Sequence, residues 1–252
     1  MRPALSPNTI VPLQQWQSLP SGEWLQQQVE ANLSDWLPRL FGYHLLKLGP
    51  LASQLSSSAC PIQHQISLAN NDGSVHADLN ALPFQQGTID ACIASFCLEF
   101  DQDPHRILRE IDRVMICGGH LVLIGFNGFS PLGIGYMLPH LRKRPPWNGR
   151  LFNPSRVEDW LGVLGYRILE TEPVTLHSFL AKPERYSLVR QALELSLPKW
   201  GSVYMIVARK TDCPLTPVRK KWRVPRPTVL NPIADLASFD RDKSRASNQE
   251  VD

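Results

Sequence analysis

The middle of the chain alternates between strand-like and helix-like hydrophobic patterns. Residues 88–95, TIDACIAS, form a short apolar run that predicts a buried strand. From Ile107 to Met115 the apolar positions then recur every three or four residues, which indicates one buried face of a helix. Residues 120–126, HLVLIGF, predict a second buried strand. Strand, helix and strand with short connections make a βαβ unit, so we expect two parallel strands in an α/β sheet.

Capping signals place the starts of two helices in this region. Asp103 can serve as the N-cap of the helix in the βαβ unit, with Pro104 at its first helical position and a Gly-Gly pair after its end. Downstream, Asn153 can cap another helix that leads into a strand. Residues 202–210, SVYMIVARK, predict a last strand.

Changes in pattern and composition divide the chain into three parts. We expect residues 1–21 to be an irregular segment, with Ser21 capping a helix that begins near Gly22. Residues 22–210 should form one α/β domain. Residues 211–252 contain many prolines and charges, which cannot assemble a core, so they should be a basic, largely disordered tail.

The segment between Cys60 and Leu79 departs from the strand–helix alternation. Only ANNDG, residues 69–73, separates two strand-like stretches there. Five residues are too few for the crossover that joins parallel strands, and Asn-Asp-Gly is a turn sequence. This segment therefore predicts an antiparallel β-hairpin.

The bulk composition fits a globular protein without a membrane span. The chain has 252 residues, 43% of them hydrophobic, and a formal net charge of +3, which is too small to imply a polyanionic partner. Its first residues lack the unbroken apolar segment of a signal peptide. No run approaches the roughly 18 apolar residues of a spanning helix.

The five cysteines are scattered and form no Cys-x-x-Cys pair. Neither a zinc site nor a disulfide framework is indicated, and we expect no bound metal. The plain interpretation is a set of reduced thiols in a cytoplasmic protein.

Several segments of the domain resemble the class I S-adenosylmethionine-dependent methyltransferases of the type 11-like group. The resemblance rests on ADLNALPF, TIDACIASFCLEF, DPHRILREIDRVM and CGGHLVLIGF, which occur in the order and spacing of that family. With GYHLLKLG at residues 42–49, the chain is most similar to the bacterial YafS-type proteins. The resemblance implies a Rossmann-like three-layer α/β sandwich that is remodelled at its second and third strands, and S-adenosylmethionine as cofactor.

The same resemblance implies a set of cofactor-binding residues at the carboxyl ends of the strands. Gly49 would be the first glycine of the binding loop, and Asp78, with Leu79 beside it, would contact the adenine. Ser95 and Phe96 would border the methionine end. Asp78 could instead be a turn residue at a strand end, and Ser95 a satisfied hydroxyl of the core.

Two further residues are catalytic candidates by resemblance. Glu99 matches a glutamate frequent at that point of the family and could line the pocket or act as a base. Asn127 closes the second strand of the βαβ unit and would face the substrate. The alternatives are a structural carboxylate for Glu99 and a turn former for Asn127.

The glycine-rich loop departs from the family pattern of an acidic residue followed by three alternate glycines. This chain has Lys47, Gly49, Leu51 and Ser53 at those positions. A leucine takes up space where the backbone must approach the cofactor. Lys47 would have to turn away or pair with the carboxylate of the cofactor. The carboxylate that holds the ribose hydroxyls in the family also has no clear counterpart.

Two functions from different classes are therefore open. The first is a divergent S-adenosylmethionine-dependent methyltransferase acting on a small molecule, since methyl transfer needs positioning more than a catalytic dyad. The second is an inactive methyltransferase-like binding or scaffold protein. Its basic tail could associate with RNA, although short basic runs are commonly solvated surface. Residues 129–152 form a long insertion that could act as a lid or substrate cover. The oligomeric state is not indicated.

Overall fold

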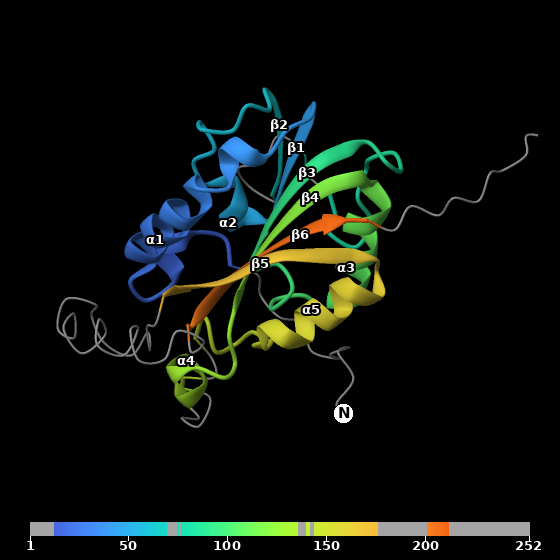
Figure 1. The fold of residues 1–252 in the computed structure, drawn as a ribbon. Coiled ribbons are helices and arrows are strands. Elements are labelled where there is room, and N and C mark those ends of the chain that lie inside the picture. Colours follow the sequence, from blue (N-terminus) through green and yellow to red (C-terminus); the bar gives the residue numbers. More distant parts are fainter. Residues whose placement is uncertain are drawn as a thin grey trace, which may run out of the picture. The chain divides into compact units, whose positions relative to one another are not determined.

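A six-stranded sheet forms the centre of the protein in the described part of the chain (Figure 1). The computed structural model describes residues 13–69, 75, 77–135, 140–141, 144–175 and 201–211, all within one compact unit. The strand order is β2-β1-β3-β4-β6-β5. The strands are β1 (His44–Leu48), β2 (His64–Leu68), β3 (Ile89–Ser95), β4 (Met115–Phe126), β5 (Tyr166–Thr175) and β6 (Val203–Lys210).

Five α-helices and two 3₁₀ turns accompany this sheet in the residues described. They are η1 (Trp16–Ser18), α1 (Gly22–Ser34), η2 (Leu37–Arg39), α2 (Pro50–Ser53), α3 (Pro104–Val114), α4 (Pro131–Ile134) and α5 (Pro154–Val163). None of the helices that the structure describes is both long enough and apolar enough to cross a membrane.

The βαβ unit is confirmed. Strands β3 and β4 pair in parallel on either side of α3, and β1 and β2 extend the parallel part of the sheet. Helix α3 begins at Pro104, and its Asp103 cap accepts a hydrogen bond from the Arg106 amide. The Asn153 side chain caps α5 in the same way, by accepting from the Ser155 amide. Strand β6 runs antiparallel to both β4 and β5.

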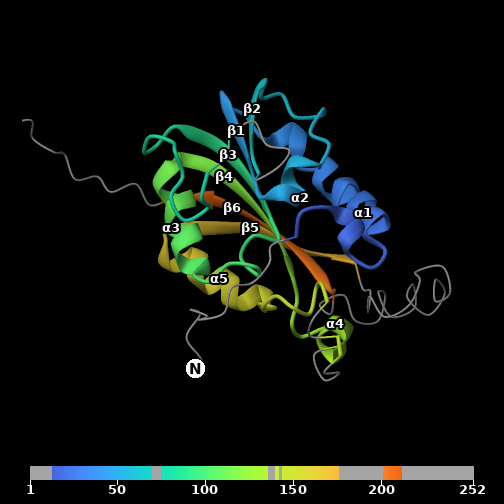
Figure 2. The same ribbon diagram turned by 180° about the vertical axis from the view of Figure 1, so that it is seen from behind.

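Two hydrophobic cores lie on the two faces of the sheet and make the expected three layers. On β1, Leu45 belongs to one core with side chains of α1, whereas Leu46 and Leu48 belong to the other, with side chains of α3 and α5. This follows from the alternation of side chains along a strand. Figure 2 shows α3 and α5 beside one another, away from α1. The α/β sandwich expected from the sequence is confirmed.

The expected antiparallel hairpin is wrong. Strand β2 pairs in parallel with β1, and the next described contact is a single parallel bridge between Leu68 and Val75. The Val75 amide donates to the Ser67 carbonyl at 3.1 Å. The length rule applies to a full parallel ladder, which needs a long crossover, but a single bridge needs only a local return of the chain. In the described residues the third strand of the family is thus reduced to one bridge.

The segment before α1 contributes to the core. Trp16 is fully buried, and Leu13 and Leu19 pack in the same core. Helix α1 begins at Gly22, as predicted, where a Cβ would overlap the Trp16 carbonyl. The Ser21 side chain makes no capping hydrogen bond, contrary to the prediction. The division at residues 21 and 210 stays a prediction, and the tail beyond Thr211 lies outside the described residues.

The expectation of entirely reduced cysteines is wrong at Cys117. Cys60, Cys92 and Cys97 are buried free thiols, but the exposed Cys117 near the start of β4 is disulfide-bonded. Spacing along a sequence cannot show that two cysteines come within the roughly 4.4–6.8 Å between Cα atoms that a disulfide requires.

Candidate functional site

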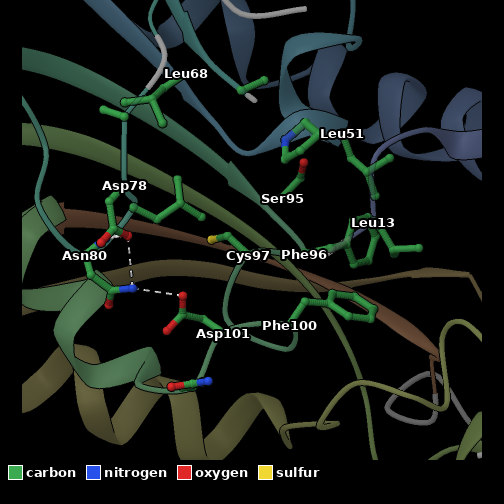
Figure 3. A pocket seen from close by; sticks show the side chains of 15 residues that line it. Leu13, Leu51, Leu68, Asp78, Asn80, Ser95, Phe96, Cys97, Phe100 and Asp101 are labelled. Atoms are coloured by element: carbon green, nitrogen blue, oxygen red, sulfur yellow. Dashed lines mark hydrogen bonds between the residues drawn. The ribbon is translucent and has the colours of Figure 1, made fainter. Parts of the chain in front are cut away.

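A pocket of ≈320 Å³ opens at the carboxyl ends of β1, β2 and β3 (Figure 3). Its volume is in the range of small-molecule sites. The walls come from segments far apart in the sequence: Leu13, Pro50–Leu51, Leu68–Ala69, 77–80, 95–97 and 100–102. This edge of a parallel α/β sheet is where ligands bind in such folds, because the connecting loops leave a crevice there.

The end of β3 forms the floor of the pocket. The Ser95 side chain is 2% exposed, and its hydroxyl has no hydrogen-bond partner in the described structure. Phe96 follows with a positive φ of 51°, and its ring packs on Trp16 and Phe126 at centroid distances of 5.6 and 4.3 Å. A buried hydroxyl without a partner is costly, so a ligand that bonds to Ser95 would relieve that cost. The satisfied-hydroxyl alternative does not describe Ser95.

Gly49 touches this floor from the neighbouring strand. Its φ is +98°, and a Cβ there would come 3.2 Å from the Ser95 carbonyl oxygen. The positive φ strongly favours glycine at this position, and a Cβ would make a tight contact in addition. Gly49 stands just before the pocket-lining residues Pro50 and Leu51.

The other positions of the altered glycine pattern are Lys47, Leu51 and Ser53, and each makes a structural contact. The Lys47 ammonium turns away from the pocket and donates to the Leu55 carbonyl at 2.8 Å, and burial lowers the pKa of Lys47. Leu51 is buried and lines the pocket, while its carbonyl accepts from the Trp16 indole at 3.2 Å. Ser53 closes the short helix α2 by donating to the Pro50 carbonyl.

Two carboxylates and an amide form a polar wall. The Asn80 side-chain amide donates to Asp78 at 3.3 Å and to Asp101 at 2.9 Å, as the dashed lines in Figure 3 show. Asp78 also accepts from the Asn80 backbone amide, and its carbonyl accepts from the Ala81 amide. Asp78 therefore shapes a turn, as in the alternative, and also lines the pocket, while its contact with the adenine stays a prediction. Leu79 lines the pocket beside it.

Helix α3 holds the loop that carries this wall, which sequence reasoning missed. The Arg113 guanidinium donates to the carbonyls of Leu82 and Phe84, and the Glu110 carboxylate accepts from the Leu82 amide. The two side chains form an ion pair at 2.8 Å, and the hydrogen bond from Arg113 lowers the pKa of Glu110. Their i,i+3 spacing indicates the pair, but only the fold brings the loop against it.

The two catalytic candidates do not line the pocket. Glu99 is fully buried, and one of its carboxyl oxygens accepts from the Phe126 amide at 2.8 Å. Burial raises the pKa of Glu99 to about 8. The Asn127 amide donates to the Gly201 carbonyl, and its oxygen accepts from the Phe129 amide, both at 2.9 Å. Asn127 therefore occupies the turn-forming role that was the alternative.

The described end of the long insertion supports the pocket wall from outside. The Arg150 amide donates to the Glu99 carbonyl, and its guanidinium donates to the carbonyls of Asp101 and Gln102 at 2.7 and 3.1 Å. Trp147 is buried and donates to the Leu132 carbonyl at 2.9 Å. The basic residues Arg142 and Lys143, like the basic tail, lie outside the described residues.

The end of β2 carries no acidic side chain in the described residues. Strand β2 ends at Leu68 and is followed by Ala69, so no counterpart of the expected ribose-binding carboxylate stands directly after it; Asp72 lies outside the described residues. No group of three or more His, Cys, Asp or Glu side chains that could hold a metal ion occurs in the part of the chain searched.

Comparisons with known proteins agree with this geometry. Residues 50–123 match the family model of a methyltransferase domain. The chain is 35% identical over 235 residues to the Escherichia coli (strain K12) protein YafS, itself described as uncharacterized, with 90% of this chain and 93% of that protein covered.

Solved structures show the same fold at lower identity. An S-adenosylmethionine-dependent methyltransferase from Archaeoglobus fulgidus aligns with a TM-score of 0.52 at 19% identity, covering 73% of this chain and 94% of that one. A methyltransferase from Thermotoga maritima, described as a possible histamine N-methyltransferase, aligns with a TM-score of 0.50 at 16% identity, covering 75% and 92%.

Proposed function

The chain belongs to the class I S-adenosylmethionine-dependent methyltransferases and, within them, to the YafS-like proteins, and we propose that it is a divergent methyltransferase acting on a small molecule. The observation that carries this proposal is the pocket at the carboxyl edge of β1, β2 and β3, which brings Asp78, Ser95 and Phe96 together. The solved structures support the fold only.

The pocket residues suit the cofactor chemically. The Asp78 carboxylate can accept from an amino or hydroxyl group of a nucleoside, and Leu79 offers an apolar surface beside it. The buried Ser95 hydroxyl lacks a partner that a polar ligand would supply. Gly49 keeps the loop close to Ser95 without a side chain of its own. S-adenosylmethionine, when bound, would supply the methyl group.

What the protein itself contributes is positioning and exclusion of water. Leu13, Leu51, Phe96 and Phe100 give the pocket an apolar side on which an acceptor can rest. Glu99 lies outside the pocket and is largely protonated at neutral pH, since its pKa is about 8. We therefore assign no catalytic base, and orientation of the acceptor is the main expected contribution.

A small-molecule acceptor suits the charges of the pocket better than nucleic acid. Its described lining contains Asp78 and Asp101 but no Lys, Arg or His. Phosphate backbones are bound mainly through basic side chains, so such a lining offers them little.

Calorimetric titration with S-adenosylmethionine and S-adenosylhomocysteine tests the proposal. We expect measurable binding that weakens about tenfold or more in Asp78→Ala, because a hydrogen bond to a charged group contributes ~1.5–3 kcal/mol. Asp159→Ala removes an exposed carboxylate from α5 instead and should leave binding unchanged. Full affinity in Asp78→Ala would contradict the proposed site.

The alternative function predicts a different result in the same titration. Leu51 in the loop and the lack of a carboxylate directly after β2 favour a binding or scaffold protein without methyltransferase activity. That function is supported if neither compound releases heat nor raises the melting temperature at millimolar concentration. A search for protein or RNA partners would then follow.

A cytoplasmic location stays a prediction. The free thiols of Cys60, Cys92 and Cys97 support it. The Cys117 disulfide opposes it, because disulfides are rare in that compartment.

A further inference from the structure

The charges that line the pocket are of one sign. Asp78 and Asp101 are linked through the Asn80 amide, so the two carboxylates are held close together. Arg106 and Arg150 lie near this wall, but their guanidinium groups donate to the backbone carbonyls of Asn80, Asp101 and Gln102, and neither residue lines the pocket. Hydroxyls, amines and cations are favoured beside such a wall, and a carboxylate is repelled.

Lys47, the basic residue nearest to Gly49 in the sequence, makes a structural hydrogen bond instead of pointing into the pocket. Lys47 could have paired with a ligand carboxylate, but its ammonium is buried and donates to the Leu55 carbonyl at 2.8 Å. Leu55 is the residue that follows α2 and its C-cap Gln54, so Lys47 fastens the loop onto β1. Because the Lys47 ammonium makes this hydrogen bond to the Leu55 carbonyl, it does not pair with a ligand carboxylate.

Leu51 takes up room on another side of the pocket, beside Leu13 and away from Asp78 and Asn80 (Figure 3). It is 1% exposed, lines the pocket and belongs to the core that contains Leu13, Trp16 and Phe96. Figure 3 shows its side chain next to Leu13, above Phe96. The Trp16 indole bond to the Leu51 carbonyl fixes this part of α2. A rigid apolar side chain replaces the open space that glycine would leave.

From these three features we infer that the pocket recognises the nucleoside and sulfur end of its ligand and discriminates against a carboxylate-bearing arm. The preferred chemical class is a neutral or cationic sulfur-substituted purine nucleoside. The inference rests on the proposed function for the site itself. It adds that the carboxylate on the amino-acid arm of S-adenosylmethionine contributes no affinity here.

A comparison of three ligands on the native full-length protein tests this inference by calorimetry. 5′-Methylthioadenosine lacks the whole amino-acid arm of S-adenosylhomocysteine and should bind as tightly, within about threefold, or more tightly. Decarboxylated S-adenosylmethionine keeps an arm of similar length without the carboxylate. It should bind several-fold more tightly than S-adenosylmethionine, because only the repelled charge has been removed.

Variants in α2 test the role of the leucine. Leu51→Gly should raise the affinity for S-adenosylhomocysteine by about fivefold or more while changing that for 5′-methylthioadenosine less than about twofold. Ala52→Gly is the matched control, since Ala52 is buried in the same helix but does not line the pocket. If Leu51→Gly unfolds, Leu51→Ala makes the same test, because it removes most of the side chain and keeps the Cβ. The expected gain in affinity is then smaller.

The failures of the two proposals are distinguishable. S-adenosylhomocysteine binding at least about tenfold more tightly than 5′-methylthioadenosine to the native protein would overturn this inference and leave the proposed function standing. Binding of none of the ligands would overturn both. Equal ligand preferences in the native protein and a folded Leu51→Gly variant would exclude Leu51 as the cause.

Discussion

At the scale of single residues, backbone strain gathers at the floor of the pocket. Gly49 and Phe96 both have positive φ, at +98° and 51°. For a phenylalanine this conformation costs on the order of 1 kcal/mol or more, and the packing of Phe96 on Trp16 and Phe126 must outweigh it. Strained residues that persist in this way are concentrated at functional sites, which supports the pocket as the site.

Gly49→Ala should lower the free energy of unfolding by about 1–2 kcal/mol and weaken ligand binding, because the new Cβ faces both strain and the Ser95 carbonyl. Urea denaturation and calorimetry measure the two effects. Gly162→Ala is the matched control, since nothing lies within 4 Å of its Cβ position in α5 and helix propensity should make it neutral or stabilising. A Gly49→Ala variant as stable as the native protein would contradict the argument.

The resemblance located the pocket residues better than the catalytic candidates. Asp78, Leu79, Ser95 and Phe96 line the pocket and Gly49 does not, and their binding of the cofactor stays a prediction. Glu99 and Asn127 also follow strands β3 and β4, but their side chains turn into the protein. Position along a strand predicts which edge a residue reaches, whereas the direction of a loop side chain depends on its local backbone.

At the scale of elements, one face of α3 packs in the core and another binds the loop at residues 82–84. Ile107, Leu108 and Ile111 pack in the core beneath the sheet, as the helical periodicity predicted. The polar side chains of Glu110 and Arg113 hold residues 82–84. Those residues follow Asp78 and Asn80 of the polar wall in sequence, so the position of these two residues depends on this helix.

Arg113→Ala should cost about 1–3 kcal/mol of unfolding free energy, because two backbone carbonyls and the Glu110 carboxylate lose their partner. Amide exchange over residues 77–84 should become faster, and ligand binding weaker. Arg109→Ala is the control on the same helix. The ion pair of Arg109 with Asp103 is long at 3.8 Å and its side chain is 62% exposed, so a change below about 0.5 kcal/mol is expected. Equal losses of unfolding free energy in Arg113→Ala and Arg109→Ala would contradict the role of Arg113 in holding residues 82–84.

At the scale of the whole molecule, an ionisable group is enclosed where β4 and β6 meet. Glu99 and the Tyr204 hydroxyl both lie close to Gly125, since a Cβ on Gly125 would come 2.5 Å from an oxygen of each. Burial raises the pKa values of Glu99, Cys97 and Tyr204, so all three are expected to be mainly neutral at pH 7.

Folding stability should therefore fall as the pH rises past the ordinary pKa of a glutamate. Between about pH 4.5 and 8 the folded state keeps the Glu99 proton that the unfolded state releases, so the free energy of unfolding decreases by up to ~1.4 kcal/mol per pH unit. Glu99→Gln keeps an acceptor for the Phe126 amide and should remove this slope. Denaturant titrations across that range measure it.

The control for the pH experiment is Glu23→Gln, which removes an exposed carboxylate from α1. Its stability curve should run parallel to that of the native protein. A Glu99→Gln curve that also ran parallel would show that Glu99 is ionised in the folded state over this range.

The sequence by itself determined the features that depend on neighbouring residues. Asp103 and Pro104 start α3, alternating apolar residues make β3 and β4 buried, and the order of motifs specifies the fold. Such signals survive without tertiary context because capping and side-chain periodicity act over a few residues.

Only the tertiary structure decided the contacts that join distant segments. It turned Lys47 to the Leu55 carbonyl, set Glu99 under the Phe126 amide, and replaced the expected hairpin by one parallel bridge at Val75. Each of these depends on which backbone groups the packed layers leave without a partner, and that is known only once the layers have assembled.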